Sequence, residues 1–239
     1  MTDLSELKLY ATKPHPCSYL PGKDATTIFI DPDADMNGDI FSQLSELGFR
    51  RSGHHVYRPK CQDCRACVPI RIPVEEFKMS RSQKRCIKAN RDVQTLIVDN
   101  IDTEEHYQLY ANYIEQRHAD GDMYPPSVQQ YRDFLTSEWG ITRYLEFRIE
   151  NRLIAVSVCD LLDNGISAIY AFFDPNETKR SLGVFNILFQ TQWAKELKLP
   201  FVYLGYWISK CKKMSYKVEY RPFQVLIENR WVVVKDYKS

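Results

Sequence analysis

Leu145-Glu146-Phe147-Arg148-Ile149 alternates apolar and charged residues, the pattern of a strand with one buried face. Glu150-Asn151 is a turn signal, and an apolar run from Leu153 to Leu161 follows it. Asp163-Asn164-Gly165 marks a second turn before residues 166–173, which are again mostly apolar. This stretch therefore predicts a three-stranded antiparallel meander.

The elements that follow the meander define the expected fold class. After a loop over residues 174–180, we expect a helix over residues 181–198 and a strand over residues 201–204. A meander followed by a loop, a helix and another strand is the core order of the acyltransferase fold that N-acetyltransferases share. We therefore expect an α+β fold that resembles the N-acetyltransferases (GNAT-like), with an antiparallel or mixed sheet flanked by helices.

The remaining elements are shorter, and we divide the chain at residue 100. Residues 1–100 form a smaller N-terminal α/β region, and residues 101–239 form the acyltransferase-like region. Pro69 and Pro73 lack amide donors, so the segment that contains them should be an edge strand or an irregular segment. The other expected elements are a strand over residues 28–30, a helix capped by Asp39 and ended by Gly48, a helix capped by Ser80 and reaching Asn90, a helix over residues 104–118, and a hairpin with its turn at residues 228–230.

Composition describes an ordinary globular protein of 239 residues, with 44% apolar and 26% charged residues. No run of about 18 apolar residues could span a bilayer, and the first six residues lack the basic and apolar regions of a signal peptide. We therefore expect a cytoplasmic protein that binds no membrane. The net charge is only +1, so any attraction to nucleic acid must come from local basic patches.

One such patch is the helix that begins near Ser80. Arg81, Lys84, Arg85 and Lys88 stand at helical spacing, and no carboxylate lies between Glu76 and Asp92. Such a face can simply be solvated, but without acidic neighbours it favours binding to a phosphate backbone. A second patch combines rings and cations near the C-terminus, in the segments Tyr203-Leu204-Gly205-Tyr206-Trp207-Ile208 and Lys212-Lys213-Met214-Ser215-Tyr216-Lys217. Rings and cations together suit a single-stranded RNA end.

Seven cysteines are present, and three of them form the pattern Cys61-x2-Cys64-x2-Cys67. A zinc ion or an iron–sulfur cluster needs four ligands, so Cys17, Cys86, His54 or His55 would have to complete the site. The alternative is three buried or half-buried thiols around a tight turn. The pattern alone leaves the metal unknown.

Two further features bear on catalysis. Asp160 ends an apolar strand, where a carboxylate needs a partner, and it could orient or deprotonate an attacking amine. Arg180-Ser181-Leu182-Gly183-Val184-Phe185 partly matches the loop with which N-acetyltransferases bind a pyrophosphate. Phe185 stands at the last position of that loop, where a ring obstructs close approach, so coenzyme A is a weaker candidate than another anion.

Several motifs follow one another along the chain: Cys17-x-Tyr19-Leu20-Pro21, Gly53-His54-His55-Val56-Tyr57-Arg58-Pro59, the three-cysteine cluster, Ser80-Arg81-Ser82-Gln83-x-Arg85, Arg117-His118-x-Asp120-Gly121-x-Met123, Asp174-Pro175, Arg180-Ser181-Leu182-Gly183 and Tyr203-Leu204-Gly205-Tyr206-Trp207-Ile208. Their order resembles the aminoacyl-tRNA protein transferases of the N-degron pathway. The resemblance runs from about residue 16 to residue 222. Eukaryotic members of that family, which transfer arginine, have an N-terminal Cys-x2-Cys pair and an adjacent cysteine pair that bind metal. In this chain Leu20 replaces the second cysteine of the first pair, so a structural zinc or iron–sulfur cluster stays open.

Within this family, the short form with the three-cysteine cluster resembles the bacterial members. That resemblance implies a reaction. Leucine would pass from leucyl-tRNA to the N-terminal amine of proteins that begin with Asp or Glu, without a required cofactor and without DNA as a partner. Asp160, Tyr170 and Tyr206 are the catalytic candidates, and Arg71 or Arg81 would bind the acceptor carboxylate bidentately. The candidates for tRNA binding are Lys84, Arg85, Lys88, Lys179, Arg180, Lys213 and Lys217. The alternatives are arginyl transfer from arginyl-tRNA, a coenzyme A-dependent N-acetyltransferase, and a non-enzymatic RNA-binding module stabilised by zinc.

Overall fold

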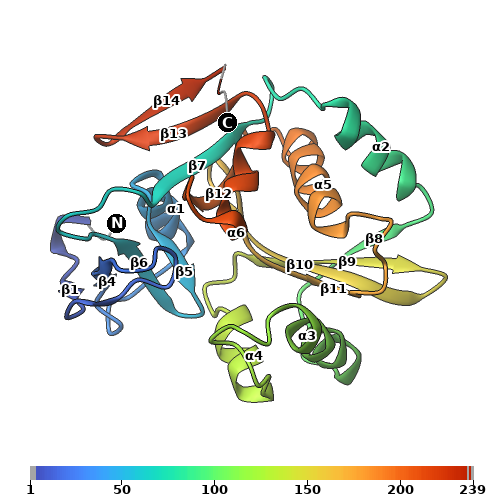
Figure 1. Cartoon of the computed structure of the whole chain (residues 1–239), viewed down its shortest axis with the longest axis horizontal. Helices are drawn as coiled ribbons and strands as arrows, with labels where there is room; N and C mark the ends of the chain where they lie inside the picture. Colours follow the sequence, from blue (N-terminus) through green and yellow to red (C-terminus); the bar gives the residue numbers. More distant parts are fainter. Residues whose placement is uncertain (1–3, 236, 238–239) are drawn as a thin grey trace.

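The predicted meander lies in the large sheet of the protein (Figure 1). The structure is a computed structural model that describes residues 4–235 and 237. Residues 1–3, which belong to the N-terminal stretch discussed above, lie outside the described residues. Every neighbouring pair in the sheet is antiparallel except β11 and β12, which are parallel, so the sheet is mixed. Its strand order is β14 (Arg230–Val234), β13 (Phe223–Ile227), β7 (Val68–Pro73), β12 (Phe201–Trp207), β11 (Gly165–Phe173), β10 (Arg152–Leu162), β9 (Thr142–Ile149) and β8 (Gln94–Val98).

Helices cover both faces of this sheet (Figure 1). On one face, α5 (Leu182–Glu196) and α2 (Arg81–Ala89) pack over a core that includes Phe147 and Leu188. On the other face, α3 (Glu104–Arg117) and α4 (Val128–Leu135) enclose a second core that includes Phe172. Burying apolar side chains on both faces of the meander accounts for the nearly continuous apolar run of β10.

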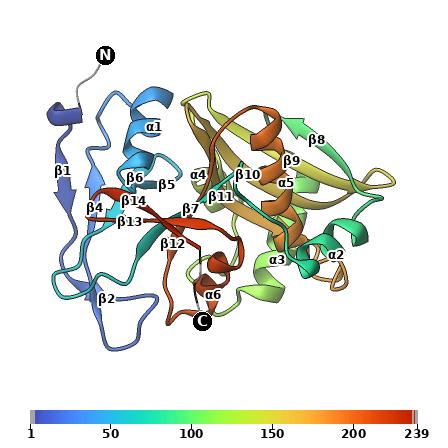
Figure 2. The same cartoon turned by 90° about the horizontal axis from the view of Figure 1, so that it is seen from above.

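A smaller four-stranded sheet packs beside the large one (Figure 2). Its apolar residues and those of α1 (Gly38–Glu46) form a third core that reaches Leu162 and Tyr203 of the large sheet. The order of the small sheet is β1 (Leu9–Ala11), β4 (Thr27–Ile30), β6 (His55–Pro59) and β5 (Arg50–Ser52). The other short elements are η1 (Leu4–Glu6), the pair β2 (His15–Pro16) and β3 (Asp24–Ala25), α6 (Lys212–Ser215) and η2 (Tyr216–Glu219).

Several predictions from local pattern are confirmed. The meander, the helix α5 and the strand β12 lie where the sequence placed them. Ser80 caps α2 in a capping box, in which its hydroxyl accepts from the Gln83 amide and its own amide donates to the Gln83 side chain. Glu228 and Asn229 adopt the positive φ angles, 49° and 61°, that a two-residue hairpin turn requires.

Other predictions are corrected. The N-cap of α1 is Asn37, whose side chain accepts from the Ile40 amide at 2.9 Å, whereas Asp39 lies inside the first turn. Strand β7 lies between β12 and β13 instead of at an edge. Only Ile70 and Arg71 of β7 pair with β13, so Pro69 and Pro73 lie on either side of the paired residues. β7 and β8, which both precede residue 100, belong to the large sheet.

The expected fold class holds at a coarse level: a large mixed sheet flanked by helices, with a smaller N-terminal sheet and helix. Among residues 4–235 and 237, no helix has the length and apolar character needed to cross a membrane.

Gly53 offers a test of how the small sheet packs against helix α4, which covers the large sheet. Its φ is +57°, its amide donates to the Phe134 carbonyl at the end of α4, and an added Cβ would lie 1.9 Å from the Asp133 carbonyl oxygen. We expect Gly53→Ala to lower the free energy of unfolding in urea well beyond the roughly 1–2 kcal/mol of a left-handed alanine. Gly22→Ala is the matched control, because Gly22 has φ +70° and open space around its Cβ position. Equal losses in the two variants would contradict this account.

Candidate active site

The two parallel strands of the large sheet, β11 and β12, are paired over three residues and then diverge. We call the place where they separate, beyond Ser167 and Tyr203, the fork. β11 and β12 pair only at Gly165 with Phe201, Ile166 with Val202, and Ser167 with Tyr203. Beyond these pairs β11 continues along β10 and β12 continues along β7. The diverging parts leave backbone groups that no neighbouring strand satisfies, and side chains must bond to them instead.

Each strand carries one extra residue where the fork begins. In β11 the register with β10 shifts beside Ile169, and in β12 the register with β7 shifts between Tyr203 and Tyr206. The second irregularity includes Gly205, whose φ of +78° is a left-handed conformation that glycine adopts without strain. Such bulges bend strands and re-aim side chains, and they are common beside active sites.

A row of polar residues crosses the sheet at the level of the fork. Cross-strand neighbours in register share a face, so these side chains lie on one face of the sheet. We call this set the polar row: Thr142, Asp160, Ser167, Tyr203, Arg71 and Gln224.

Two arginines of β5 reach the polar row from the small sheet. Arg51 is 3% exposed and bonds both oxygens of Asp160, with Nε–Oδ2 at 2.6 Å and Nη2–Oδ1 at 2.7 Å. Arg50 is 9% exposed and donates to the Ser167 hydroxyl at 2.6 Å and to the Ala168 carbonyl, the first carbonyl beyond the paired part of β11. Arg50 therefore caps one arm of the fork.

Lys217 caps the other arm. It is 6% exposed, and its Nζ donates to the Tyr206 carbonyl of β12 at 2.7 Å. Burial lowers the pKa of Lys217 to about 7, and the charge of Arg50 acts in the same direction. This position corrects the prediction that Lys217 lies on a tRNA-binding surface.

Asp160, the predicted amine-binding carboxylate, is fully buried. In addition to Arg51, the Thr142 hydroxyl donates to its Oδ1 at 2.8 Å. A carboxylate that orients an amine needs a free oxygen that faces the substrate. The geometry therefore favours the structural alternative, in which Asp160 holds the meander to a cation of the small sheet.

The two tyrosine candidates differ. Tyr206 is buried, and its hydroxyl donates to the Gly48 carbonyl at 2.8 Å. The Tyr170 hydroxyl is buried and has no partner among the residues that the structure describes. Its ring contacts Phe134 of α4 and Tyr113 of α3, and burial raises its pKa, which keeps the phenol protonated as a donor. Only Tyr170 has a hydroxyl free for a ligand.

Of the two arginines predicted to bind the acceptor, Arg71 is already paired. Its Nη1 bonds Glu46 of α1 at 2.6 Å, its Nε bonds Gln224 at 2.7 Å, and its guanidinium stacks 3.4 Å from the centre of the Phe201 ring. Arg71 thus fastens α1 to the polar row. Arg81, by contrast, is exposed in the first turn of α2.

The basic face of α2 is confirmed as a surface. Arg81, Lys84, Arg85 and Lys88 are all exposed, whereas Gln83 and Cys86 turn inward. Within the described part of the chain, none of the four cations has a side-chain hydrogen bond or an ion pair. They can therefore meet phosphate without first breaking an intramolecular contact.

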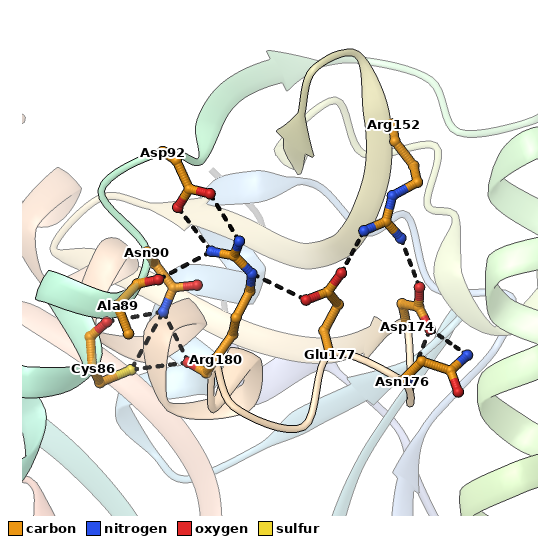
Figure 3. A network of polar contacts seen from close by, with 9 residues as sticks. All are labelled: Cys86, Ala89, Asn90, Asp92, Arg152, Asp174, Asn176, Glu177 and Arg180. Carbon is orange, nitrogen blue, oxygen red and sulfur yellow. Dashed lines mark hydrogen bonds and ion pairs between the residues drawn. The ribbon is translucent and has the colours of Figure 1, made fainter.

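Arg180, another predicted tRNA contact, belongs to an ion network (Figure 3). It pairs bidentately with Asp92 at 2.8 Å, bonds Glu177 at 3.0 Å, and donates to the Ala89 carbonyl at the end of α2. Asn90 in turn donates to the Arg180 carbonyl at 2.8 Å. The network therefore fixes α2 to the start of α5, and Arg180 is not free to hold a phosphate.

Two other predicted tRNA contacts are exposed. Lys179 precedes Arg180 in the loop before α5. Lys213 of α6 lies 3.3 Å from an Asp120 oxygen, and both side chains are exposed, so this ion pair contributes little. Both lysines are accessible to a ligand.

The cysteine cluster does not form a metal site as arranged. No group of three or more His, Cys, Asp or Glu side chains within residues 4–235 and 237 has suitable geometry. Burial raises the pKa of the Cys67 thiol to about 12, and the nearby thiols of Cys61, Cys17 and Cys64 act in the same direction. Cys86, one proposed fourth ligand, lies elsewhere, with its sulfur 3.5 Å from the Arg180 carbonyl. We derive no step through a metal.

The fold and the site define a class of α/β proteins in which a mixed sheet opens between two parallel strands and buried cations line the opening. Residues 15–85 and 105–227 match the two halves of the family described as arginine-tRNA-protein transferase, N terminus and C terminus. The chain belongs to this family.

The most informative relatives are curated bacterial proteins of the same length. The chain is 59% identical to the aspartate/glutamate leucyltransferase of Saccharophagus degradans, over 97% of this chain and 99% of that protein. It is 58% identical to the protein of that name from Teredinibacter turnerae, over 97% of this chain and 96% of the relative. A conserved protein of unknown function from Bacteroides thetaiotaomicron shares the fold, with a TM-score of 0.50, 10% identity, and coverage of 83% and 79% of the two chains.

Sequence reasoning missed the residues that define the fork. Arg50 and Arg51 lie in Phe49-Arg50-Arg51-Ser52-Gly53, a segment that was not expected to form a strand. Two adjacent arginines beside Phe49 were the available signal. Which of them would meet a carboxylate depends on contacts with residues more than 100 positions away.

The Arg51–Asp160 pair predicts a large loss of stability on breaking it. We expect Asp160→Asn to lower the free energy of unfolding by about 3–5 kcal/mol, because Arg51 would remain buried without a counter-charge. The double variant Arg51→Met with Asp160→Leu should lose clearly less, since it leaves no charge unpaired. Urea unfolding of both variants measures this, and a double variant less stable than Asp160→Asn would contradict it.

Lys217 predicts a pH dependence of stability. Its pKa is near 7 in the folded state and near 10.5 in the unfolded chain, so between these values the unfolded state binds one more proton. This group therefore makes stability rise with pH above 7. We expect Lys217→Met to remove about one proton from the slope of unfolding free energy against pH between 7.5 and 9. An unchanged slope in the variant would show that Lys217 stays charged.

Proposed function

We infer that the chain transfers leucine from leucyl-tRNA to the N-terminal amine of proteins that begin with Asp or Glu. The observation that carries this conclusion is the identity of 53–59% with aspartate/glutamate leucyltransferases along nearly the whole length of both chains. The relatives are all named for leucine, which favours leucyl over arginyl transfer.

The reaction needs little beyond positioning. The ester that links leucine to the tRNA is already activated, so a neutral amine can attack its carbonyl carbon. A carbon–nitrogen bond forms, the bond to the ribose oxygen breaks, the amine loses a proton and the leaving oxygen gains one. An enzyme accelerates this step by aligning the reactants and by placing donors where the oxyanion develops. No cofactor is needed in this scheme.

We place the reaction at the fork between β11 and β12. Tyr170 lies on the diverging part of β11, and its unpartnered hydroxyl can donate to the developing oxyanion or to the leaving ribose oxygen. Arg50 and Lys217 keep the two arms apart by bonding the Ala168 and Tyr206 carbonyls. Asp160 and Tyr206, whose polar atoms are already bonded, support the site from within.

The tRNA would lie along the basic face of α2. Its four cations are exposed and unpaired, and Lys78 and Arg91 extend the face at either end. The ion network of Figure 3 fixes this helix to α5, which packs on the large sheet. A rigid basic helix can therefore hold the acceptor stem at a constant distance from the fork.

Two finer points belong to the same proposal. The forked sheet after a meander supports kinship with the acyltransferase fold of N-acetyltransferases. Arg180, however, is occupied by Asp92 and Glu177, which disfavours a pyrophosphate of coenzyme A at the start of α5. A leucyl-tRNA substrate also implies a reaction in the cytoplasm and a product marked for degradation through its new N-terminus.

The function is tested by a transfer assay. The protein is incubated with leucyl-tRNA, arginyl-tRNA or acetyl coenzyme A, and with peptides that begin with Asp, Glu, Arg or Ala. We expect leucine to be incorporated only into the Asp and Glu peptides. Incorporation of arginine or acetyl groups instead would establish one of the alternatives.

The basic face predicts a salt effect on tRNA binding. We expect Arg85→Ala to lower the slope of log affinity against log salt by about one, because one phosphate contact is lost, and Arg85→Ala with Lys88→Ala to lower it by about two. Arg132→Ala is the control, since Arg132 lies on α4 at the opposite face of the sheet. Unchanged slopes in the α2 variants would remove this helix from the tRNA site.

A further inference from the structure

Arg50 and Arg51 are neighbours on one strand and are both buried, yet only one of them is neutralised. Arg51 has a carboxylate within 2.7 Å of two nitrogens, whereas Arg50 bonds only a hydroxyl and a carbonyl. No carboxylate of the described residues forms an ion pair with Arg50. Because a buried charge without a counter-charge is costly, the fold alone does not account for this guanidinium.

The surrounding charges leave Arg50 as the unbalanced cation. At the polar row, Arg51 is matched by Asp160 and Arg71 by Glu46. Asp160 is also the carboxylate whose charge acts on Arg50, but its oxygens are bonded to Arg51 and Thr142. Lys217, whose pKa burial lowers to about 7, supplies no counter-charge and adds only part of a positive charge to the fork at neutral pH. One anion would complete this arrangement.

The guanidinium also has N–H donors that no hydrogen bond of the described residues uses. Of the five N–H donors of an arginine, two are accounted for by Ser167 and Ala168. An added Cβ at Gly205 would lie 3.3 Å from the Arg50 Nε. Glycine at position 205 therefore lets the β12 backbone approach the guanidinium closely, where a larger residue would crowd it.

We propose that Arg50 binds the side-chain carboxylate of the acceptor's N-terminal Asp or Glu. The proposal rests on the proposed function and names its specificity residue, in place of Arg71, which is paired with Glu46, and Arg81, which lies on the basic face of α2. A single buried guanidinium, with its planar set of N–H donors, suits one small carboxylate held bidentately. A tRNA phosphate is the less suitable anion, because backbone contacts are made by exposed cations such as those of α2.

Binding the carboxylate here would also explain the choice between acidic and amide side chains. A neutral Asn or Gln cannot neutralise Arg50, and its amide group would face further donors. An acceptor that begins with Asn or Gln would leave the Arg50 guanidinium buried without a counter-charge. The enzyme would discriminate against such an acceptor because of this unpaired charge.

The test measures transfer to two peptides that differ only in their first residue, Glu or Gln. In Arg50→Gln we expect KM for the Glu peptide to rise by about 10- to 100-fold, because one charge-assisted hydrogen-bonded contact is lost. The ratio of transfer to the Glu peptide over the Gln peptide should fall toward one. The dissociation constant of leucyl-tRNA should stay within about twofold of wild type. Arg81→Gln is the comparison variant and should keep the Glu preference.

Three results would overturn the proposal. The first is a folded Arg50→Gln protein that keeps the wild-type preference for Glu. The second is an equal loss of leucyl-tRNA binding, which would assign Arg50 to a phosphate. The third is a loss of the Glu preference in Arg81→Gln instead. Melting temperatures of all variants identify any that are unfolded.

If Arg50→Gln does not fold, Arg50→Lys decides the matter. This variant keeps the positive charge beside the polar row but lacks the planar guanidinium. KM for the Glu peptide should therefore rise by at least about 10-fold, and leucyl-tRNA binding should be unchanged. No rise would contradict the proposal. Failure of the proposed function is distinguishable, since then the wild-type protein itself would transfer no leucine to either peptide.

Discussion

The contact of two arginines of β5 with the polar row is the interaction on which the site depends. β5 has only three residues, yet its Arg50 and Arg51 cross from the small sheet to β10 and β11 of the large one. Arg71 and Glu46 make a second connection from the large sheet to α1. Buried ion pairs add little net stability, but they penalise any other placement of the two sheets, because a displaced charge would be left unpaired.

This docking and the fork require each other. Because β11 and β12 diverge, the Ala168 and Tyr206 carbonyls lack strand partners and would be unsatisfied in a dry interior. Arg50 and Lys217 supply the donors, so the opening in the sheet exists only while the small sheet and the segment after β12 are in place. Gly205 completes the arrangement, since its left-handed backbone bends β12 without placing a side chain against Arg50.

The cations of this protein fall into three groups that composition does not separate. Those of α2 are exposed and unpaired, as expected for phosphate binding. Arg51, Arg71 and Arg180 are matched by carboxylates and hold elements together. Arg50 and Lys217 are buried without a carboxylate, and these two lie at the fork. A near-neutral chain can thus present a basic surface on α2 and keep Arg50 and Lys217 buried inside.

The sequence by itself determined whatever depends on residues a few positions apart. The meander, the N-cap at Ser80 and the basic face of α2 follow from periodicity and local hydrogen bonding, and all three were predicted. The motif order also identified the family. Only the tertiary structure decided which charged groups meet, because Arg51 and Asp160 are 109 residues apart and Arg50 and Ser167 are 117 apart. Whether a charged group is exposed, paired or buried without a counter-charge depends on sheet order and register, which no local pattern encodes. For this reason the sequence did not predict the bonds that Asp160, Arg71, Arg180 and Lys217 make within the fold, or the burial of Arg50.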